Sequence, residues 1–373
     1  MRRLIWAFVV ILVIGVFGGR AWWLYQHREI NENVVKIGAI LPLSGFLSTN
    51  GEAAKNALLM AEEVFNNEQH PVKVQLVIED GKFTAKDSIS AFRKLQSKGV
   101  DIMLPYGDVT SKAIMPLLRE KNIPLFALSG SEETVNSYQN SIGFLPNSKY
   151  LIGKSPSFIL SDLKMSDIAI IYQHEPAIEN TTKDIISSIH MLGGNVVAEE
   201  KFSMNSSDVH NIVAKILSKN PQAIIVFGWG PAYTAILNDL RRQLFMGPII
   251  TDNNITSVKN ALINHGDGIY IFDIAFDYKS DDPLVRTFLD NYKQKYNSVP
   301  DIFAVYVYET FLLIANSIDK VDYDLLNMKD IILKTEKEKS LIGPISFYSS
   351  RLIKLDLVIK QMQVDGTAKI IKK

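Results

Sequence analysis

Two short segments carry hydroxyl groups where a parallel strand is expected to lead into a helix. Gly107–Ser111 contains Thr110 and Ser111, and Ser129–Ser131 contains Gly130 between two serines. In open parallel sheets, ligands bind beyond the carboxyl ends of the strands. Helix N-termini at that edge present unpaired N–H groups and a partial positive charge, which suit a carboxylate. The hydroxyls could instead be plain N-caps, so the segments predict either an anion site or two ordinary helix starts.

Trp229 is a candidate of a different kind. It lies in the turn 228–231, between two glycines and before a proline, directly after an expected strand. A large aromatic side chain in such a turn has little core to enter. We therefore expect Trp229 to line a cleft or to pack between two lobes.

The sequence lacks the motifs of common enzymes and metal sites. Gly228-x-Gly230 has no third glycine of a dinucleotide fingerprint, and no Walker loop, G-x-S-x-G elbow or H-E-x-x-H helix occurs. The six histidines are scattered, and the absence of cysteine excludes disulfides, thiol catalysis, thiolate metal sites and a lipidated N-terminal cysteine. We expect no catalytic residues, no metal and no cofactor.

Composition sets the broad class of the protein. The 373 residues are enough for two domains, and 40 basic residues balance 40 acidic ones. This balance leaves no electrostatic footprint for nucleic acid.

The first 30 residues predict export from the cytoplasm. Arg2 and Arg3 precede an apolar run that extends over residues 4–25. About 22 apolar residues make roughly 33 Å of helix, which is enough to span a bilayer. We expect residues 4–25 to anchor the chain in the inner membrane. In the alternative, residues 1–30 contain a signal peptide that is cleaved after Ala21, and the product is soluble in the periplasm.

The elements that must position the candidate residues alternate between strands and helices. Strands are expected at 34–41, 72–79, 101–105 and 124–128, and a second set follows Tyr150 at 168–172, 196–200, 223–227 and 248–251. Helices of period 3.6 separate them, with Thr84 and Asp87 spaced like a capping box. The first strand leads into the loop 42–51, and a helix is expected from about Glu52. Two such sets predict an α/β protein with two doubly wound parallel-sheet lobes.

Segments spread over 34–373 share their order and spacing with one known family. They comprise the opening strand, loop and helix at 35–45 and 51–67, the acidic turn at 77–82, the Ser/Thr-rich segment 121–131, and the later segments 193–208, 282–318, 343–347 and 364–366. Together they resemble the Leu/Ile/Val-binding-protein family of type I periplasmic binding proteins, the substrate-binding components of amino-acid ABC importers. The resemblance implies two lobes joined by three crossings, near 143–150, 272–277 and 334–343. Lobe one would then comprise 34–146 plus 277–337, and lobe two 147–276 plus 338–373.

The resemblance also implies roles for individual residues. It gives the carboxylate-binding positions to Thr110 or Ser111 and to the segment Ser129–Ser131. It places Asn50 over the ligand, although Asn50 could simply be a residue at a helix entry. It brings Asp252 near the position that pairs with a ligand ammonium, although Asp252 could be an ordinary turn residue.

Two departures from the family pattern bear on the ligand. The Tyr-Gly pair after the first strand of lobe two is missing, and 108–111 replaces the usual serine pair. Asp108 would repel an anion, so the ligand could be a polar or cationic compound instead of a branched-chain amino acid.

These observations lead to one expected function and one alternative. We expect an extracytoplasmic solute-binding protein whose lobes close around an amino acid or a similar small polar ligand, with an ABC permease as its partner. The alternative is a ligand-poor envelope scaffold or sensor-like partner protein on the same fold.

Overall fold

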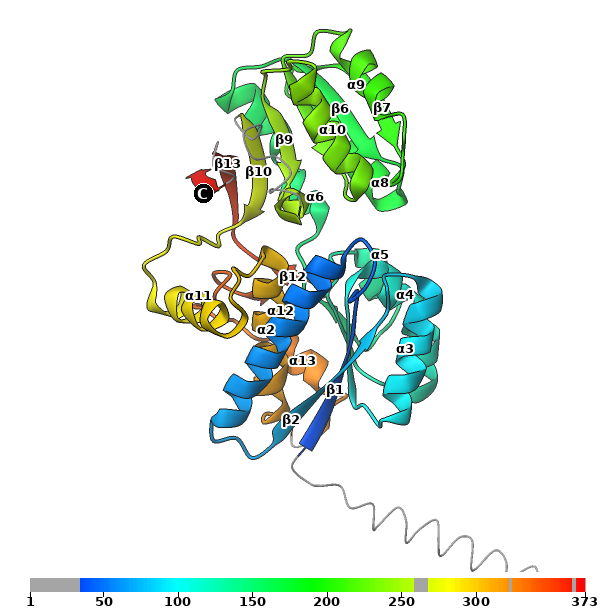
Figure 1. Ribbon diagram of the computed structural model, residues 1–373, viewed down its shortest axis with the longest axis vertical. Coiled ribbons are helices and arrows are strands. Elements are labelled where there is room, and N and C mark those ends of the chain that lie inside the picture. The colour runs from blue at the N-terminus through cyan, green and yellow to red at the C-terminus, as the bar shows by residue number, and fades with distance from the viewer. Residues whose placement is uncertain (1–33, 258–267, 322–323, 364–366, 373) are drawn as a thin grey trace, which may run out of the picture.

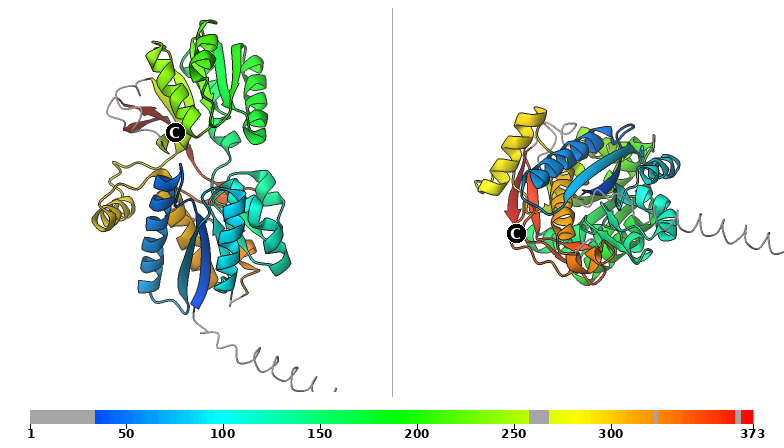
Figure 2. Two further views of the ribbon diagram at one scale, coloured as in Figure 1. Left: turned by 45° about the vertical axis from the view of Figure 1, so that its right-hand side comes forward. Right: turned by 90° about the horizontal axis from the view of Figure 1, so that it is seen from below.

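The computed structural model describes residues 34–257, 268–321, 324–363 and 367–372. They form two α/β lobes, one above the other in Figure 1, and separate chain segments connect them (Figure 2). The expected signal segment 1–30, with its anchor at 4–25, lies outside the described residues. Among the helices that are described, none has the length and apolar character to span a bilayer.

Lobe one is built on five parallel strands in the order β2-β1-β3-β4-β5. Successive side chains of a strand point to opposite faces of the sheet. Ile37 and Leu41 therefore pack with α2 and α12, whereas Ile40 packs with α3 and α4 on the other face. The strands are β1 (Val34–Leu41), β2 (Lys73–Asp80), β3 (Ile102–Pro105), β4 (Leu125–Ala127) and β5 (Ser141–Gly143). The helices are α2 (Ser48–Asn67), α3 (Ala85–Ser97), α4 (Gly107–Lys121), α5 (Glu132–Asn136), α11 (Pro283–Tyr296), α12 (Ile302–Ile318) and α13 (Met328–Leu333).

Lobe two is built on seven strands in the order β14-β13-β10-β9-β8-β6-β7. Five of them are parallel, and β13 and β14 add an antiparallel edge. The strands are β6 (Asp167–Gln173), β7 (Asn195–Phe202), β8 (Ala223–Phe227), β9 (Ile249–Asp252), β10 (Ile269–Ile274), β13 (Leu357–Met362) and β14 (Ala368–Lys372). The helices are α6 (Ser148–Ile152), α7 (Ser155–Ser157), a π-helical turn (Phe158–Asp162), α8 (Pro176–Met191), α9 (Val209–Leu217), α10 (Pro231–Arg242) and a 3-10 turn (Asn253–Ser257).

The sequence predicted the start of helix α3 correctly but placed the start of helix α2 too late. The Thr84 hydroxyl accepts the Asp87 N–H at 3.1 Å, so the capping box is confirmed. Helix α2, however, begins at Ser48 and not near Glu52, because the N–H of Gly51 already donates to the carbonyl of Leu47 at 2.8 Å. Asn50 therefore lies in the first turn of a helix.

The third crossing between the lobes comes later than 334–343. Strands β11 (Ser346–Phe347) and β12 (Ile353–Lys354) form a small hairpin on lobe one. Arg351 donates to four backbone carbonyls of lobe one, between residues 135 and 141. Leu352 bridges to Gly143, and Leu355 lies in the lobe-one core. The chain therefore crosses to β13 only after Leu355.

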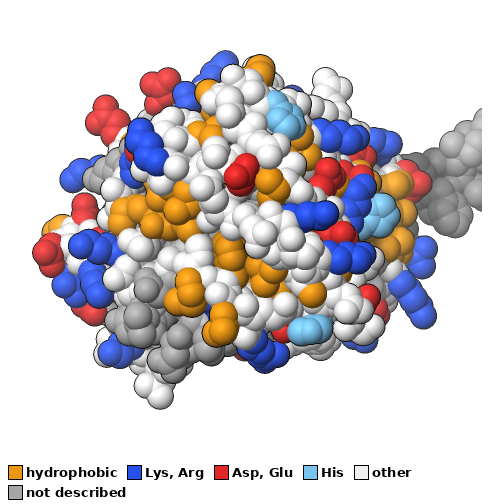
Figure 3. Space-filling view, turned by 90° about the horizontal axis from the view of Figure 1, so that it is seen from above, with side chains coloured by type: hydrophobic (Ala, Val, Ile, Leu, Met, Phe, Trp, Pro, Cys, Tyr) orange, Lys and Arg blue, Asp and Glu red, His pale blue; other side chains and the backbone are white. Residues whose placement is uncertain are grey.

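Basic and acidic side chains are mixed on the face of the molecule that lies beyond lobe two. Figure 3 looks onto the end of the molecule beyond lobe two and shows basic and acidic side chains interspersed around apolar patches. That face presents no extended patch of one sign.

Two neighbouring inner strands of the lobe-two sheet, β10 and β13, are joined by a buried ion pair. Lys360 of β13 donates to Asp273 of β10 at 2.7 Å, and their side chains are 5% and 3% exposed. Lys360→Met would leave the carboxylate buried and uncompensated, which typically costs about 3–5 kcal/mol. We expect a clear drop in the urea midpoint of unfolding measured by circular dichroism. The control is Lys372→Met, which breaks an exposed pair with Asp162 and should cost less than about 1 kcal/mol. Equal effects of the two substitutions would contradict this account.

Candidate functional site

Strand order points to the same location in each lobe. In β2-β1-β3 the order reverses between β1 and β3, and in β7-β6-β8 it reverses between β6 and β8. Connections leave such neighbouring strands in opposite directions, so a crevice opens at their carboxyl ends, and ligands of open α/β sheets bind there. The crevice of lobe one is bordered by the loop with Phe46 and by the start of α4. The crevice of lobe two is bordered by Gln173 and Trp229.

At the lobe-one crevice, a carboxylate of the chain itself takes the hydroxyl donors. Asp108, in the first turn of α4, accepts hydrogen bonds from the Ser129 hydroxyl and, at 2.7 Å, from the Thr134 hydroxyl. The oxygen of Ser129 in turn accepts the N–H of Ser131 at 3.1 Å. Ser129 is buried, and its hydroxyl is bonded on both sides. The hydroxyls therefore hold a carboxylate, but this carboxylate is the side chain of Asp108 and not part of a ligand.

The other candidate hydroxyls make contacts within lobe one. Thr110 accepts a hydrogen bond from Ser88 of α3 at 3.3 Å, and Ser111 donates to the carbonyl of Gly107 at 2.7 Å. Ser131 caps α5 by accepting the N–H of Thr134 at 3.2 Å. A side chain at Gly130 would come within 2.4 Å of the carbonyl oxygen of Pro146. These contacts give each of the four residues a role in the structure of lobe one. That any of them contacts a ligand stays a prediction.

Asn50 also has an internal partner. Its side-chain amide donates to Asp301 at 2.9 Å, and Asp301 caps α12 by accepting the N–H of Ala304 at 2.7 Å. Asn50 thus ties the first turn of α2 to the start of α12, and only 6% of it is exposed. Its expected place over a ligand stays a prediction.

Aromatic rings from both lobes meet between the two crevices. Trp229 of lobe two stacks on Phe46 with ring centroids 6.1 Å apart and an interplanar angle of 14°. It also meets Phe83 edge to face at 5.7 Å. Phe83 continues the contact to Tyr106 at 6.4 Å, and Tyr106 to Phe303 at 6.2 Å. Trp229 thus packs against rings of lobe one, and its expected contact with a ligand stays a prediction.

The loops that carry these rings are held in place by one carboxylate. Asp80, at the end of β2, accepts the Ser44 hydroxyl at 2.6 Å and the N–H groups of Leu43 and Lys82 at 3.0 and 2.8 Å. Partial burial works against the charge of Asp80, but these hydrogen bonds prevail and lower its pKa. Asp80 thereby joins the Phe46 loop to the segment that leads to Phe83.

Phe83 is held in an uncommon conformation above the start of α4. Lys82 and Phe83 both have positive φ angles, 49° and 57°, a region that non-glycine residues rarely occupy. A side chain at Gly107 would come within 2.6 Å of the Phe83 ring. Such strain persists where the surroundings enforce it, and it clusters at ligand sites.

Asp252 lies at the end of β9, at the carboxyl edge of the lobe-two sheet, and is fully buried. It accepts two hydrogen bonds from Asn254, from the backbone N–H at 3.1 Å and from the side-chain amide at 3.0 Å. Burial nevertheless raises the pKa of Asp252 to about 7, and the nearby Asp273 carboxylate adds to the rise. A nearby cation would stabilise the ionised form of this buried carboxylate. The prediction that Asp252 pairs with a ligand ammonium is not tested by these contacts and stays a prediction.

Sequence reasoning missed several residues of this region. It noted Asp108 as a departure but not its partner Thr134, and it did not single out Phe46, Phe83 or Gln173. Gln173, at the end of β6, accepts the N–H of Trp229 at 2.9 Å and so bridges the lobe-two crevice. Gln173 ends a parallel strand and Phe83 follows one by three residues, so their position is a signal that could have found them, whereas Phe46 and Thr134 lie farther from their strands.

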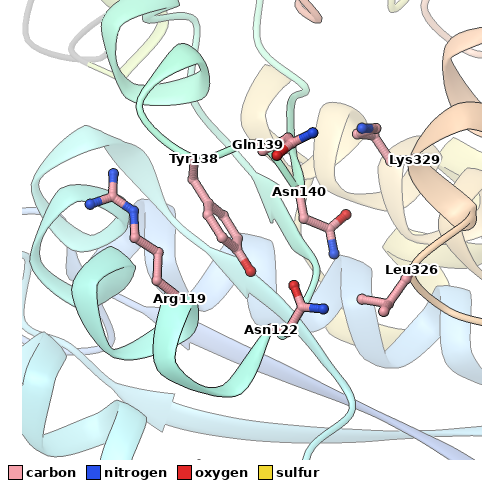
Figure 4. A pocket seen from close by; sticks show the side chains of 7 residues that line it. All are labelled: Arg119, Asn122, Tyr138, Gln139, Asn140, Leu326 and Lys329. Atoms are coloured by element: carbon pink, nitrogen blue, oxygen red, sulfur yellow. The ribbon is translucent and has the colours of Figure 1, made fainter.

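A second hollow lies at the opposite edge of the lobe-one sheet. It is open to solvent, has a volume of about 430 Å³ and lies near the amino ends of β4 and β5 (Figure 4). Two of its side chains are engaged locally: Arg119 donates to the carbonyl of Ser137, and Tyr138 donates to that of Ile123 at 2.8 Å. Its lining comprises Arg119, Asn122, Tyr138, Gln139, Asn140, Leu326 and Lys329. This hollow is separate from the two crevices.

Two facing crevices and a contact across the lobes define a two-lobe binding protein of type I. The model of the periplasmic binding protein family matches residues 34–348, and the chain belongs to that family. Its members are solute-binding proteins and not enzymes, and membership implies a location outside the cytoplasm.

Solved structures share the fold at low sequence identity. A leucine-binding protein from Thermotoga maritima has a TM-score of 0.80 at 19% identity, and the match covers 90% of this chain and 97% of that one. A solute-binding protein of an ABC transporter from R. palustris, in complex with benzoate, also has a TM-score of 0.80, at 17% identity, with 91% and 96% covered. An uncharacterized protein of Methanocaldococcus jannaschii is 22% identical over 302 residues, which are 75% of this chain and 72% of that protein.

The raised pKa of Asp252 makes a prediction about stability. An acid whose pKa is raised by folding binds a proton in the folded chain at pH values where the unfolded chain has lost it, so stability falls as pH rises from about 4 to about 7. Asp252→Asn should flatten this decline and leave the variant about 1–3 kcal/mol more stable than the parent at pH 8.

The measurement is urea unfolding at pH 5 and pH 8. Asp184→Asn, at an exposed position on α8, controls for the general change in net charge. A parent protein that is as stable at pH 8 as at pH 5, with no gain in Asp252→Asn, would contradict a protonated Asp252.

Proposed function

We propose that this protein is an extracytoplasmic solute-binding protein whose lobes close around one small polar molecule. The observation that carries the proposal is the stack of Trp229 on Phe46. Each ring lies beside the crevice of its own lobe, so their contact brings the two crevices face to face. A molecule held there would touch both lobes and would favour the closed arrangement.

Closure requires that the lobes turn on their connections. Three separate segments cross between the lobes, after β5, after β10 and after β12. Beside the first crossing, Tyr150 of α6 stacks on Tyr348, with centroids 4.5 Å apart at 18°. Short crossings with a fixed contact beside them suit hinge motion, in which a few residues absorb the rotation.

Transport is the use we propose for this closure. The benzoate-bound protein to which the chain is similar is the solute-binding protein of an ABC transporter. The apolar run 4–25 supports a membrane anchor for the chain, with the cleaved signal peptide as its alternative. We propose an ABC permease as the partner.

A thermal-shift screen of the full-length chain tests the proposal. Amino acids, small amides, amines and aromatic acids form the panel. A ligand present at 100 times its Kd stabilises the folded state by about 2.7 kcal/mol, so a true ligand should raise the melting temperature measurably.

Two variants then locate the site. Trp229→Ala should abolish the shift, whereas Tyr296→Ala, a ring substitution on α11 away from the crevices, should keep it. If no compound stabilises the folded protein, the envelope scaffold or sensor-like partner becomes the better account.

A further inference from the structure

At the lobe-one crevice, the hydroxyl groups that could bind a ligand already donate hydrogen bonds to a carboxylate of the chain itself. The Asp108 carboxylate holds the hydroxyls of Ser129 and Thr134. It also lies in the first turn of α4, where the N–H groups and the helix dipole favour a negative charge. A ligand carboxylate would have to displace this side chain or lie beside it.

Neither displacement nor close approach is favourable. Displacement would break two hydrogen bonds of an ionised group, and such bonds are among the stronger ones in proteins. Approach would put two like charges together. Within the described residues, neither Asp108 nor Asp252 forms a salt bridge with a Lys or Arg side chain, although other carboxylates form 14 such pairs.

The rest of the site suits a positive charge. The rings of Trp229 and Phe46 lie nearly parallel with their centroids 6.1 Å apart, and the ring of Phe83 stands almost at right angles to that of Trp229. Phe46 is 48% exposed, so its ring is accessible, and aromatic faces attract organic cations. Asp252, at the carboxyl edge of the lobe-two sheet, adds a buried acidic group whose oxygens accept hydrogen bonds only from the uncharged Asn254 among the contacts of the described residues.

We propose that the site takes an organic amine that lacks a free carboxylate, and that Asp108 is the residue that excludes carboxylates. This inference rests on the proposed solute-binding function and narrows its ligand class. It departs from the amino-acid ligand that the family resemblance implies.

Matched compounds that differ in one group separate the two parts of the inference. Leucine and leucinamide differ only at the carboxylate, and leucinamide and 4-methylpentanamide differ only at the ammonium. Phenylalanine, phenylalaninamide and 3-phenylpropanamide form a second series. Calorimetry on the full-length chain should show that an amine-bearing amide binds at least about 30-fold more tightly than both its matched acid and its matched neutral amide.

Substitutions of Asp108 give the complementary test. Asp108→Ser frees the hydroxyls of Ser129 and Thr134 and removes the charge, so binding of the matched amino acid should strengthen at least about tenfold. Asp108→Asn removes the charge at nearly constant volume and should give a smaller gain. Glu120→Ser, at the exposed far end of α4, should leave the ratio between amide and acid unchanged.

The possible failures are distinguishable. If the parent protein binds amino acids as tightly as their amides, this inference is wrong and the solute-binding proposal survives. If a neutral amide binds as tightly as its amine-bearing counterpart, the requirement for a cation is wrong. If no compound binds the folded parent protein, the solute-binding proposal fails, and this inference fails with it. The relative affinities of the parent protein for amines, acids and neutral amides test the inference even if a variant does not fold.

Discussion

The structure depends on the reversal of strand order within each sheet. In both lobes the first strand of the set has its successor on one side and the following strand on the other. The connecting segments therefore diverge at the carboxyl edge, and polar groups and aromatic rings can gather there without entering a core. Three residues of the site follow from this position, because Asp108, Gln173 and Trp229 each lie at the end of, or within three residues after, a strand at a reversal.

The two crevices differ in chemistry. In lobe one, the start of α4 supplies both the anion-binding environment and, through Asp108, the anion itself. In lobe two, Asp252 is buried with a raised pKa, and Gln173 fixes the backbone of Trp229. These acidic groups, one in each lobe, underlie the proposed preference for cations, which composition alone does not reveal because the chain has equal numbers of acidic and basic residues.

The regular elements were predictable from the sequence because apolar periodicity reports burial locally. The two strand sets are of this kind, and the capping box at Thr84 follows in the same way from a local spacing of polar residues. The late third crossing was not predictable, because Arg351 and Leu352 bind to residues about 210 positions away in the chain. The start of α2 was misplaced because a single hydrogen bond from Gly51 to Leu47 extends the helix toward its N-terminus.

Within the site, residue types were easier to predict than contacts. Asp108 stands out in the sequence as an acid where a hydroxyl was expected, but its bonds to Ser129 and Thr134 depend on how the starts of α4 and α5 lie side by side. The contact of Phe46, Phe83 and Trp229 joins three loops from two lobes, and no local pattern encodes it.

Closure around a ligand is the central claim, and a distance between the lobes tests it most directly. The chain has no cysteine, so Lys86→Cys at the start of α3 and Asn180→Cys in the first turns of α8 would give one spin label in each lobe. Both positions are exposed, on helices that begin beside the crevices. The account predicts that a compound found to bind shifts the distance distribution, measured by pulsed electron paramagnetic resonance, toward shorter values. Binding that leaves this distribution unchanged would contradict it.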